Sequence, residues 1–495
     1  MILSRSFVRL PSSTAPGYVE ANLPMIEAEI DGNSELGLRL EGIDIRPSDQ
    51  VGGTSLVTFR VASSESAGAL RIENSVFEGR DRGASTAGVG FKGAGIEVLA
   101  QARAGVELLA KDVVIRDAFG DGILAVVEGG IGTGDRTVGT LELDRCEISE
   151  CGLNLPASPY LSSAIAEFSR SGVHIAVGEL GRWTSTKIDS SEVRSNYRHG
   201  VHYRSRGRFE YSPGFPLCEI LETQVVENGL VLDPNIRGDG VHCALSHDSM
   251  TLGISRCLLR GNQSAGIFAN VDSNDEQYPD YFRLLAVNSV ITENKGVRGD
   301  QQIGNEYQAP ICVTYTEAAN ASGWLKLSGV TVTANIAPYG LAVFAEDDLS
   351  YSRAELLGSG ATVIENSVFR GNVPTLGSEQ SFFPLPMTSI WDALWAQTFN
   401  CCLVGDPAFY QSGVRNNLMV DPDLRMYTAA GVQFGTTFPC TPAGGCATTS
   451  PLIDAGRAPG VPQALGTDIR GFSRPGSTPG DVSYDIGAFE VQGGE

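Results

Sequence analysis

The sequence is poor in basic residues and in long apolar runs. Its 36 lysines and arginines are outnumbered by 58 aspartates and glutamates, which gives a formal net charge of −22 at pH 7. Such a charge repels the phosphates of nucleic acids and anionic membrane surfaces, so we expect no nucleic-acid partner. No run approaches the roughly 18 consecutive apolar residues of a membrane-spanning helix, so we expect no membrane span.

Cysteine is scarce as well. Ten cysteines in 495 residues are too few for a fold that depends mainly on disulfides. The close pairs Cys146/Cys151 and Cys440/Cys446 could each close a small loop in an oxidising compartment. Alternatively, cysteines such as Cys146 serve as small buried apolar residues. The sequence leaves both interpretations open.

Glycine and proline, in contrast, are abundant. The 59 glycines and 24 prolines favour a chain with many turns. No long segment combines an apolar stripe at helical spacing with helix caps. The pattern therefore argues against an all-α fold and against alternating helices and strands.

A repeated segment organises the chain. Its nine copies recur with a mean period of about 36 residues, within the range of solenoid proteins. The residue three positions before the end of each copy is apolar, and the residue five positions before it is small or β-branched, which is the period of two expected of a strand. The copies end at Arg80, Ala118, Cys151, Asn196, Asn228, Asn262, Asn294, Asn335 and Asn372.

A second strand is predicted after most copies. It opens with glycine and a branched apolar residue, at Gly122-Ile123, Gly172-Val173, Gly200-Val201, Gly240-Val241, Gly266-Ile267 and Gly340-Leu341. A strand, a turn and a second strand then make one coil. Insertions of variable length enter between the asparagine and the glycine, as expected where loops leave a stacked core at a fixed corner.

These repeats resemble the right-handed parallel β-helix family, the fold of pectate lyases and many bacterial surface proteins, over roughly residues 60–375. The asparagine column is similar to the ladder of that family, in which each turn amide bonds to the turns above and below. The resemblance implies an all-β fold, a right-handed parallel β-helix solenoid. It implies no particular substrate, because one fold hosts many functions.

A second resemblance concerns the C-terminal residues. The segments SPLIDAG (450–456), TDIRGFSRP (467–475) and DIGAFE (485–490) resemble the module called choice-of-anchor Q, which follows β-helices in secreted bacterial proteins. A capping role agrees with the need of a solenoid to cover its open end.

We therefore expect three parts. Residues 1–60 form N-terminal β-rich coils or a cap, residues 61–375 form the β-helix, and residues 376–495 form a small C-terminal capping module.

The histidines cluster in the sequence. All five lie between residues 174 and 247, and His174, His202 and His242 share one repeat position, which Phe268 occupies in the next copy. Because the preceding valines should point inward, alternation predicts that these rings face outward in a file spaced by about 4.8 Å. A solvent-facing stripe could stack on sugars and exchange protons near neutral pH. The alternative is a side-chain ladder that serves packing alone.

A basic segment accompanies the histidines. Arginine pairs bidentately with carboxylates and sulfates, so an acidic polysaccharide such as a uronate polymer is the predicted partner. The alternative is a solvated face that pairs with acidic residues. Between residues 182 and 208 the bases are Arg182, Lys187, Arg194, Arg198, Arg204, Arg206 and Arg208, against only Asp189 and Glu192.

These patterns suggest two sets of site residues. For β-elimination the candidate catalytic residues are His202, Arg204 and His242. The candidate substrate-binding residues are His174, Arg206, Arg208 and Phe268.

Other chemistries have less support. A hydrolase needs paired carboxylates, and the best candidates, Asp121 and Asp239, are predicted to lie several coils apart. We predict no metal site, because a file of three histidines suits two ligands better than three. No cofactor is predicted; Ca²⁺ is possible, but no motif supports it.

The sequence thus favours a secreted or cell-surface monomer that binds, and could cleave, an acidic polysaccharide. The rival hypothesis is a noncatalytic surface or adhesion module. The first residues lack the apolar stretch of a secretory signal, so we expect either that a signal has been removed or that the chain is part of a longer protein.

Overall fold

The computed structural model describes most of the chain apart from a series of loops. The described residues are 2–4, 7–8, 26–30, 35–45, 55–62, 66–79, 93–101, 103–129, 137–152, 170–178, 180–206, 216–230, 237–246, 248–272, 281–295, 309–316, 322–337, 339–345, 363–372, 380–384, 399–400, 402–404, 417–441, 449–460, 462, 466–474 and 484–492.

The described residues contain strands and no α-helix, and the fold is an all-β parallel solenoid, as predicted. The chain divides into two compact units. One comprises Met1–Cys218 with Gln224–Ser249, and the other comprises Glu219–Thr223 with Met250–Glu495. The predicted domain borders at residues 60 and 375 stay predictions.

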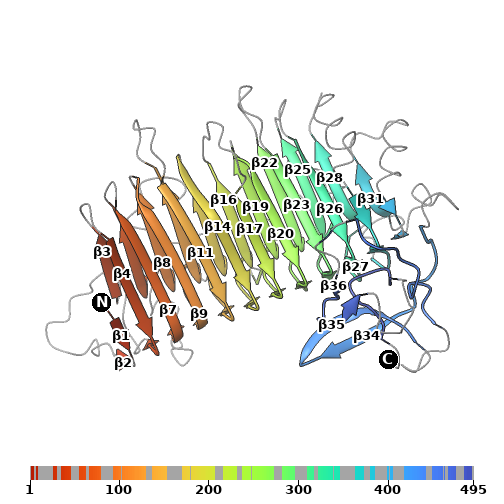
Figure 1. Ribbon diagram of the computed structural model, residues 1–495, viewed down its shortest axis with the longest axis horizontal. Coiled ribbons are helices and arrows are strands. Elements are labelled where there is room, and N and C mark those ends of the chain that lie inside the picture. The colour runs from red at the N-terminus through yellow and green to blue at the C-terminus, as the bar shows by residue number, and fades with distance from the viewer. Residues whose placement is uncertain are drawn as a thin grey trace. The chain divides into compact units, whose positions relative to one another are not determined.

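In the first unit, each coil contributes strands to two parallel sheets (Figure 1). The first sheet contains β1 (Ile2–Ser4), β2 (Phe7–Val8), β4 (Glu35–Glu41), β5 (Asp44–Ile45), β7 (Ala67–Glu78), β9 (Gly105–Arg116), β11 (Thr137–Asp144), β12 (Glu147–Ser149), β14 (Gly181–Asp189), β15 (Glu192–Arg194) and β18 (Gln224–Val226). The second sheet contains β3 (Ile26–Ile30), β6 (Val57–Val61), β8 (Ile96–Gln101), β10 (Ile123–Glu128), β13 (Val173–Val177), β16 (Val201–Ser205) and β19 (Val241–Ser246). Strand β17 (Leu217–Leu221) lies at the division between the units.

The second unit repeats this arrangement and adds two antiparallel hairpins. One parallel sheet contains β20 (Met250–Ser255), β21 (Leu258–Arg260), β23 (Tyr281–Val287), β24 (Val290–Thr292), β26 (Ser322–Ser328), β27 (Thr331–Thr333), β29 (Val363–Glu365), β30 (Val368–Phe369), β32 (Phe399–Asn400) and β33 (Leu403–Val404). The other contains β22 (Ile267–Asp272), β25 (Ile311–Thr316), β28 (Tyr339–Ala345) and β31 (Gln380–Pro384). The hairpins pair β34 (Leu424–Ala429) with β35 (Val432–Pro439), and β36 (Gly466–Thr467) with β37 (Ser473–Arg474).

The interior of each coil holds the apolar columns predicted from the repeat. Val193 pairs in register with Ile148 on one side and with Val225 on the other, and all three are fully buried. On the second sheet Val173, Val201 and Val241 pair in the same way. The period of two is therefore confirmed.

The asparagine ladder is also confirmed, within each unit. In the first unit the side-chain nitrogen of Asn196 donates to the side-chain oxygen of Asn228 at 2.9 Å. In the second, Asn262 donates to Asn294 at 2.8 Å, and Asn294 donates to Asn335 at 3.0 Å. The same oxygens accept backbone N–H groups of the neighbouring coil, so the buried turns leave few backbone groups unpaired.

The glycine that opens each second strand has a steric cause. A Cβ atom added to Gly200 would lie 2.7 Å from the carbonyl oxygen of Gly240 and 2.4 Å from Val225. A Cβ at Gly122 would lie 2.6 Å from the carbonyl oxygen of Gly172. Backbones of adjacent coils therefore approach too closely at this corner for any side chain.

Some cysteines are small buried residues and one forms a disulfide, so each of the two interpretations holds for part of the set. Cys146 and Cys151 are buried free thiols, so the loop-closing bridge considered for them is absent. Burial raises the pKa of the Cys146 thiol to about 12, as expected of an inert core residue. Cys440 is disulfide-bonded, whereas Cys446 lies outside the described residues.

The C-terminal residues contact the coils of their own unit. Arg474 donates to the side chain of Asn288 at 2.7 Å and forms a buried ion pair with Glu490 at 3.1 Å. The backbone N–H of Ala488 donates to the hydroxyl of Thr331 at 2.9 Å. These contacts hold the C-terminal segments against the coils of the second unit.

Candidate functional site

The three repeat histidines form one file on the second sheet of the first unit. His174, on β13, pairs in register with His202, on β16, which pairs with His242, on β19. The rings of His174 and His202 are stacked, with centroids 4.8 Å apart and planes at 7°. The rings of His202 and His242 meet edge to face, with centroids 5.0 Å apart. The predicted file is confirmed.

The predicted exposure of this file is wrong. His174 is 0%, His202 6% and His242 8% exposed, so the rings form no solvent-facing stripe. The outer face of the same sheet also carries a buried apolar cluster that includes Leu124 and Ala176. A parallel sheet can be covered on both faces. Alternation separates the two faces of a strand but does not tell whether the outer one meets solvent.

The predicted exposure of Phe268 is also wrong. It belongs to the second unit, where β22 pairs in register with β25. The ring is 2% exposed and packs in a cluster with Ala265, Ala309, Cys312 and Ala342. It therefore presents no open surface to a sugar.

A second column of polar residues lies beside the histidine file. Asp121, Ser171, His199 and Asp239 each immediately precede the glycine of a second strand. The N–H of that glycine bonds to the carbonyl of the column residue in the next coil, as Gly172 does to His199 and Gly200 to Asp239. As predicted, Asp121 and Asp239 lie on well-separated coils.

The sequence interpretation missed His199. It lies in the turn before β16, two residues before Val201 and three before His202, so strand alternation does not place it with the repeat histidines. The pairing of a histidine and an aspartate at the same point of successive repeats was a signal that could have been found.

The two columns meet through buried carboxylates. Nδ1 of His174 donates to Oδ2 of Asp121 at 3.2 Å, and the other oxygen of Asp121 accepts the N–H of Ser171 at 2.7 Å. His174 and Asp121 are both fully buried. The carboxylate thus fixes both the orientation and the tautomer of the ring.

Asp239 contacts two histidines. Nδ1 of His242 donates to Oδ2 of Asp239 at 2.7 Å. The backbone N–H of Asp239 donates to Nδ1 of His199 at 3.2 Å, and the same Nδ1 lies 3.4 Å from Oδ2 of Asp239. The ring centroids of His199 and His242 are 4.2 Å apart. His199, Asp239 and His242 therefore form one compact cluster.

Burial sets the charge of this cluster. It lowers the pKa of His199 and His202 well below the usual value, with neighbouring rings adding to the effect, and it also lowers the pKa of His242. For Asp239, burial acts to raise the pKa, but Arg237 and the neighbouring His199 and His242 outweigh it and hold the pKa well below the usual value. At neutral pH the rings are neutral and Asp239 is ionised.

The predicted basic segment divides between the two sheets. On the first sheet Lys187 pairs with Asp189 at 2.7 Å and Arg194 pairs with Glu147 at 3.0 Å. For these two the alternative of a charge-paired face holds. Arg204 lies on β16, half-buried and on the same face as His202, and the exposed Arg206 follows it. Arg208 lies outside the described residues.

Three arginines gather at the edge of the aspartate–histidine columns. Arg170 and Arg198 directly precede Ser171 and His199, and the N–H of Arg198 bonds to the carbonyl of Arg170 at 2.9 Å. Arg237 lies 3.9 Å from Oδ2 of Asp239. Burial lowers the pKa of Arg198, with Arg237 and Arg170 acting in the same direction.

We call Arg170, Arg198 and Arg237 the arginine rim. The Nε atoms of Arg170 and Arg198 are buried and have no hydrogen-bond partner among the described residues. The rim carries three positive charges beside the carboxylates of Asp121 and Asp239.

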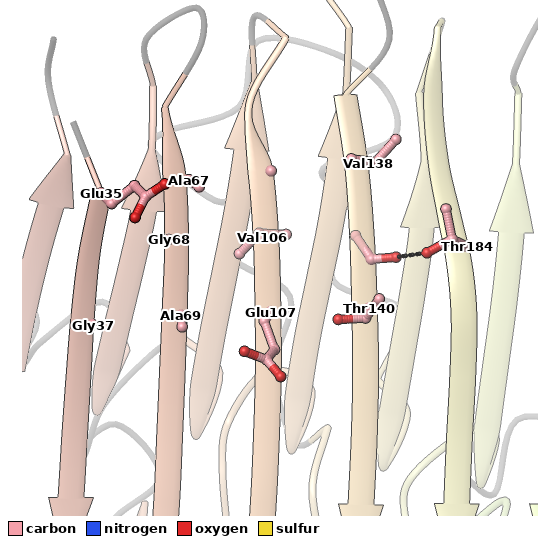
Figure 2. Close-up of a pocket in the computed structure, with 12 residues that line it drawn as sticks. Glu35, Gly37, Ala67, Gly68, Ala69, Val106, Glu107, Val138, Thr140 and Thr184 are labelled. Atoms are coloured by element: carbon pink, nitrogen blue, oxygen red, sulfur yellow. Dashed lines mark hydrogen bonds between the residues drawn. The ribbon is translucent and has the colours of Figure 1, made fainter. Parts of the chain in front are cut away.

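A separate groove lies on the outer face of the first sheet, across β4, β7, β9, β11 and β14 (Figure 2). Its volume is about 570 Å³. Small residues such as Gly37 and Ala69 form its floor, and Glu35 and Glu107 supply its charged groups. Because these charges are negative, the groove does not suit an acidic ligand.

Comparison of the chain with protein-family models, with curated proteins and with solved structures gave no match. Within the described part of the chain, no helix has the length and apolar character required to cross a membrane.

Proposed function

We propose that this chain is a secreted or cell-surface protein of the pectate-lyase-like β-helix type that binds an acidic polysaccharide. The observation that carries the proposal is the arginine rim. Guanidinium groups pair bidentately with carboxylates and sulfates, and three of them gather here within one short stretch of the coils. The half-buried Arg204 and the exposed Arg206 extend this positive surface along β16.

Binding has more support than cleavage. The base of a β-elimination must reach the C5 proton of a uronate within hydrogen-bond distance. His174 and His202 are buried, and Nδ1 of His202 has no hydrogen-bond partner among the described residues. The side chain of His242 is 11% exposed, whereas that of His174 is fully buried. We therefore propose polysaccharide binding without cleavage, and elimination by His202, Arg204 and His242 remains the rival proposal.

Two observations support a location outside the cytoplasm. Cys440 is disulfide-bonded, and disulfides persist in oxidising compartments. The C-terminal segments also resemble the choice-of-anchor Q module of secreted proteins. We propose that the protein acts there as a monomer.

Binding can be tested by affinity electrophoresis in gels that contain polygalacturonate, alginate or heparin. We expect retardation by at least one polymer. Arg198→Ala and Arg170→Ala should each weaken binding about tenfold or more, because a hydrogen bond to a charged group contributes about 1.5–3 kcal/mol. Arg145→Ala is the matched control, since this exposed arginine pairs with Asp112 and Asp144 away from the rim. No retardation by any polymer, or equal losses in all three variants, would refute the proposal.

Elimination is tested on the same polymers through the ultraviolet absorbance of unsaturated uronate ends. We expect none from the wild-type protein. Absorbance that grows with time and disappears in His242→Ala would instead establish a lyase.

A further inference from the structure

We propose that His199, Asp239 and His242 form a binding site for a divalent transition-metal ion of the zinc class. This proposal does not rest on polysaccharide binding. Its potential ligand atoms, one from each residue, all lie within 4.8 Å of one another, and all three residues are buried. The sequence interpretation considered only the file of His174, His202 and His242. The structure points to a different set, with one member from that file and two from the neighbouring column.

The contact between His199 and Asp239 is the first argument. The position of a backbone N–H is fixed by the chain, and the N–H of Asp239 points to Nδ1 of His199. That nitrogen therefore carries a lone pair rather than a hydrogen. It also lies 3.4 Å from Oδ2 of Asp239, and both side chains are fully buried. A cation that replaces the N–H of Asp239 at this nitrogen would bind both atoms.

The distances are the second argument. Tetrahedral zinc with bonds of 2.0–2.1 Å holds its ligand atoms about 3.3 Å apart. The 3.4 Å between His199 and Asp239 matches this value. The 2.7 Å between His242 and Asp239 is that of a hydrogen bond, whose proton the ion would replace. This contact would have to open to reach the tetrahedral spacing, and the ligand atoms of the two histidines lie within 4.8 Å of each other.

Unsatisfied ring nitrogens are the third, independent argument. Nδ1 of His202 is buried and has no hydrogen-bond partner among the described residues. Its ring centroid lies 5.1 Å from that of His199 and 5.0 Å from that of His242. The ring of His202 therefore lies near the three ligand residues and offers a further nitrogen ligand. A buried polar group without a partner is uncommon in folded proteins and calls for a ligand or a function.

The donor set selects the class of ion. Two imidazole nitrogens and one carboxylate oxygen suit Zn²⁺, Co²⁺ or Ni²⁺. Ca²⁺ and Mg²⁺ prefer sites made of oxygen ligands only. The partly exposed side chain of His242 gives an ion a route of entry.

The expected role is structural. His199 precedes β16, whereas Asp239 and His242 belong to the adjacent coil that contains β19. An ion bound by all three would join two successive coils at the corner where the chain inserts its loops. Binding to the folded state alone raises the stability of that state.

The test uses the full chain without an affinity tag, treated with a chelator and then dialysed against Zn²⁺ or Co²⁺. We expect about one ion retained per chain, a higher thermal unfolding temperature with Zn²⁺, and the visible absorption of four-coordinate Co²⁺. Ca²⁺ at the same concentration should produce no shift. Asp239→Asn and His242→Gln should weaken Co²⁺ binding by more than about 100-fold, beyond the losses found for outer-shell changes.

Asp248→Asn is the matched control, because it removes another buried carboxylate of the same unit that hydrogen-bonds to Ser205 and Ser249. Its Co²⁺ spectrum should be unchanged. Circular dichroism of each variant establishes that it is folded, and His242→Gln provides the test if Asp239→Asn is not. A wild-type chain that retains no Co²⁺ or Zn²⁺, or one whose Co²⁺ affinity survives both ligand substitutions, would overturn the metal site. Neither result bears on polymer retardation by the arginine rim.

Discussion

His174 stacks on His202 with ring planes only 7° apart, and both rings lie inside the protein. This stacking has two physical consequences. The first is that the rings contribute packing area like any other aromatic pair. The second is that each buried ring nitrogen requires a partner from the protein. For Nδ1 of His174 that partner is Asp121, whereas Nε2 has none among the described residues.

Asp121→Ala should therefore destabilise the first unit. The change leaves the Nδ1–H of His174 and the N–H of Ser171 buried without their acceptor. Each buried unsatisfied group costs about 1–3 kcal/mol, so we expect a loss on the order of 3 kcal/mol in the free energy of unfolding. Urea unfolding followed by circular dichroism measures it. Asp112→Asn removes the charge of a partly exposed carboxylate paired with Arg145, keeps a residue type that tolerates the φ of 54° found there, and should cost less than about 1 kcal/mol. Equal losses in the two variants would contradict the structural role of Asp121.

The asparagine ladder makes a similar prediction for the second unit. Asn294 donates to Leu259 and Asn335 and accepts two hydrogen bonds from Asn262. Asn294→Ala leaves several of these buried groups unpaired, so we expect a loss of about 3 kcal/mol, measured by urea unfolding. Gln263→Ala, which affects only an exposed bond to Lys295, is the control and should change the stability by less than about 0.5 kcal/mol. A ladder substitution as mild as the control would show that the amides serve no structural purpose.

The sequence predicts the ladder and the apolar columns because both follow from a repeat. A residue type that recurs at one point of every coil, such as Asn294, must meet its own copies in a parallel stack. The same rule places His174, His202 and His242 in one file. Burial does not follow from periodicity, since it depends on what covers the outer face of the sheet, and for this reason the predicted exposure of the rings was wrong.

The site residues that sequence reasoning missed have a different origin. Arg170 and Arg237 follow insertions of different length, so no fixed spacing aligns them with Arg198. His199 and Asp239 occupy equivalent places, but their residue types differ, and a search for identical residues does not pair them. The structure shows that the two side chains meet.

The close approach of adjacent coils at the glycines that open the second strands can be tested by adding one methyl group. Gly200→Ala places a Cβ atom against the carbonyl oxygen of Gly240, which belongs to the backbone and cannot move aside cheaply. We expect a loss of about 1–3 kcal/mol, measured as a lower urea midpoint. Gly37→Ala is the control, because a Cβ there meets no atom within 4 Å. It should be neutral or slightly stabilising, since alanine restricts the unfolded chain. A neutral Gly200→Ala would mean that adjacent coils are farther apart at this corner.

The carboxyl group of Asp485 makes the stability of the second unit depend on pH. Burial, together with the charge of Glu490, raises its pKa to about 7 in the folded protein, from 3.8 in the unfolded chain. A raised pKa means that the folded state holds the proton more tightly. The contribution of this group to stability is therefore complete below pH 3.8 and is lost as the pH rises through about 7. Between pH 5 and pH 8 the loss amounts to roughly 2–3 kcal/mol.

Asp485→Asn removes this titration but keeps the shape of the side chain. The two oxygens of Asp485 accept the N–H groups of Asp454 and Val491, and the amide retains one acceptor for them. We expect wild type to be clearly more stable than the variant at pH 5, because the protonated carboxyl group is buried at little cost. By pH 8 this advantage should shrink or reverse, since only the wild-type residue then buries a charge. Urea unfolding of both proteins at the two pH values measures the change, and a difference that stays constant from pH 5 to pH 8 would show that Asp485 does not titrate in this range.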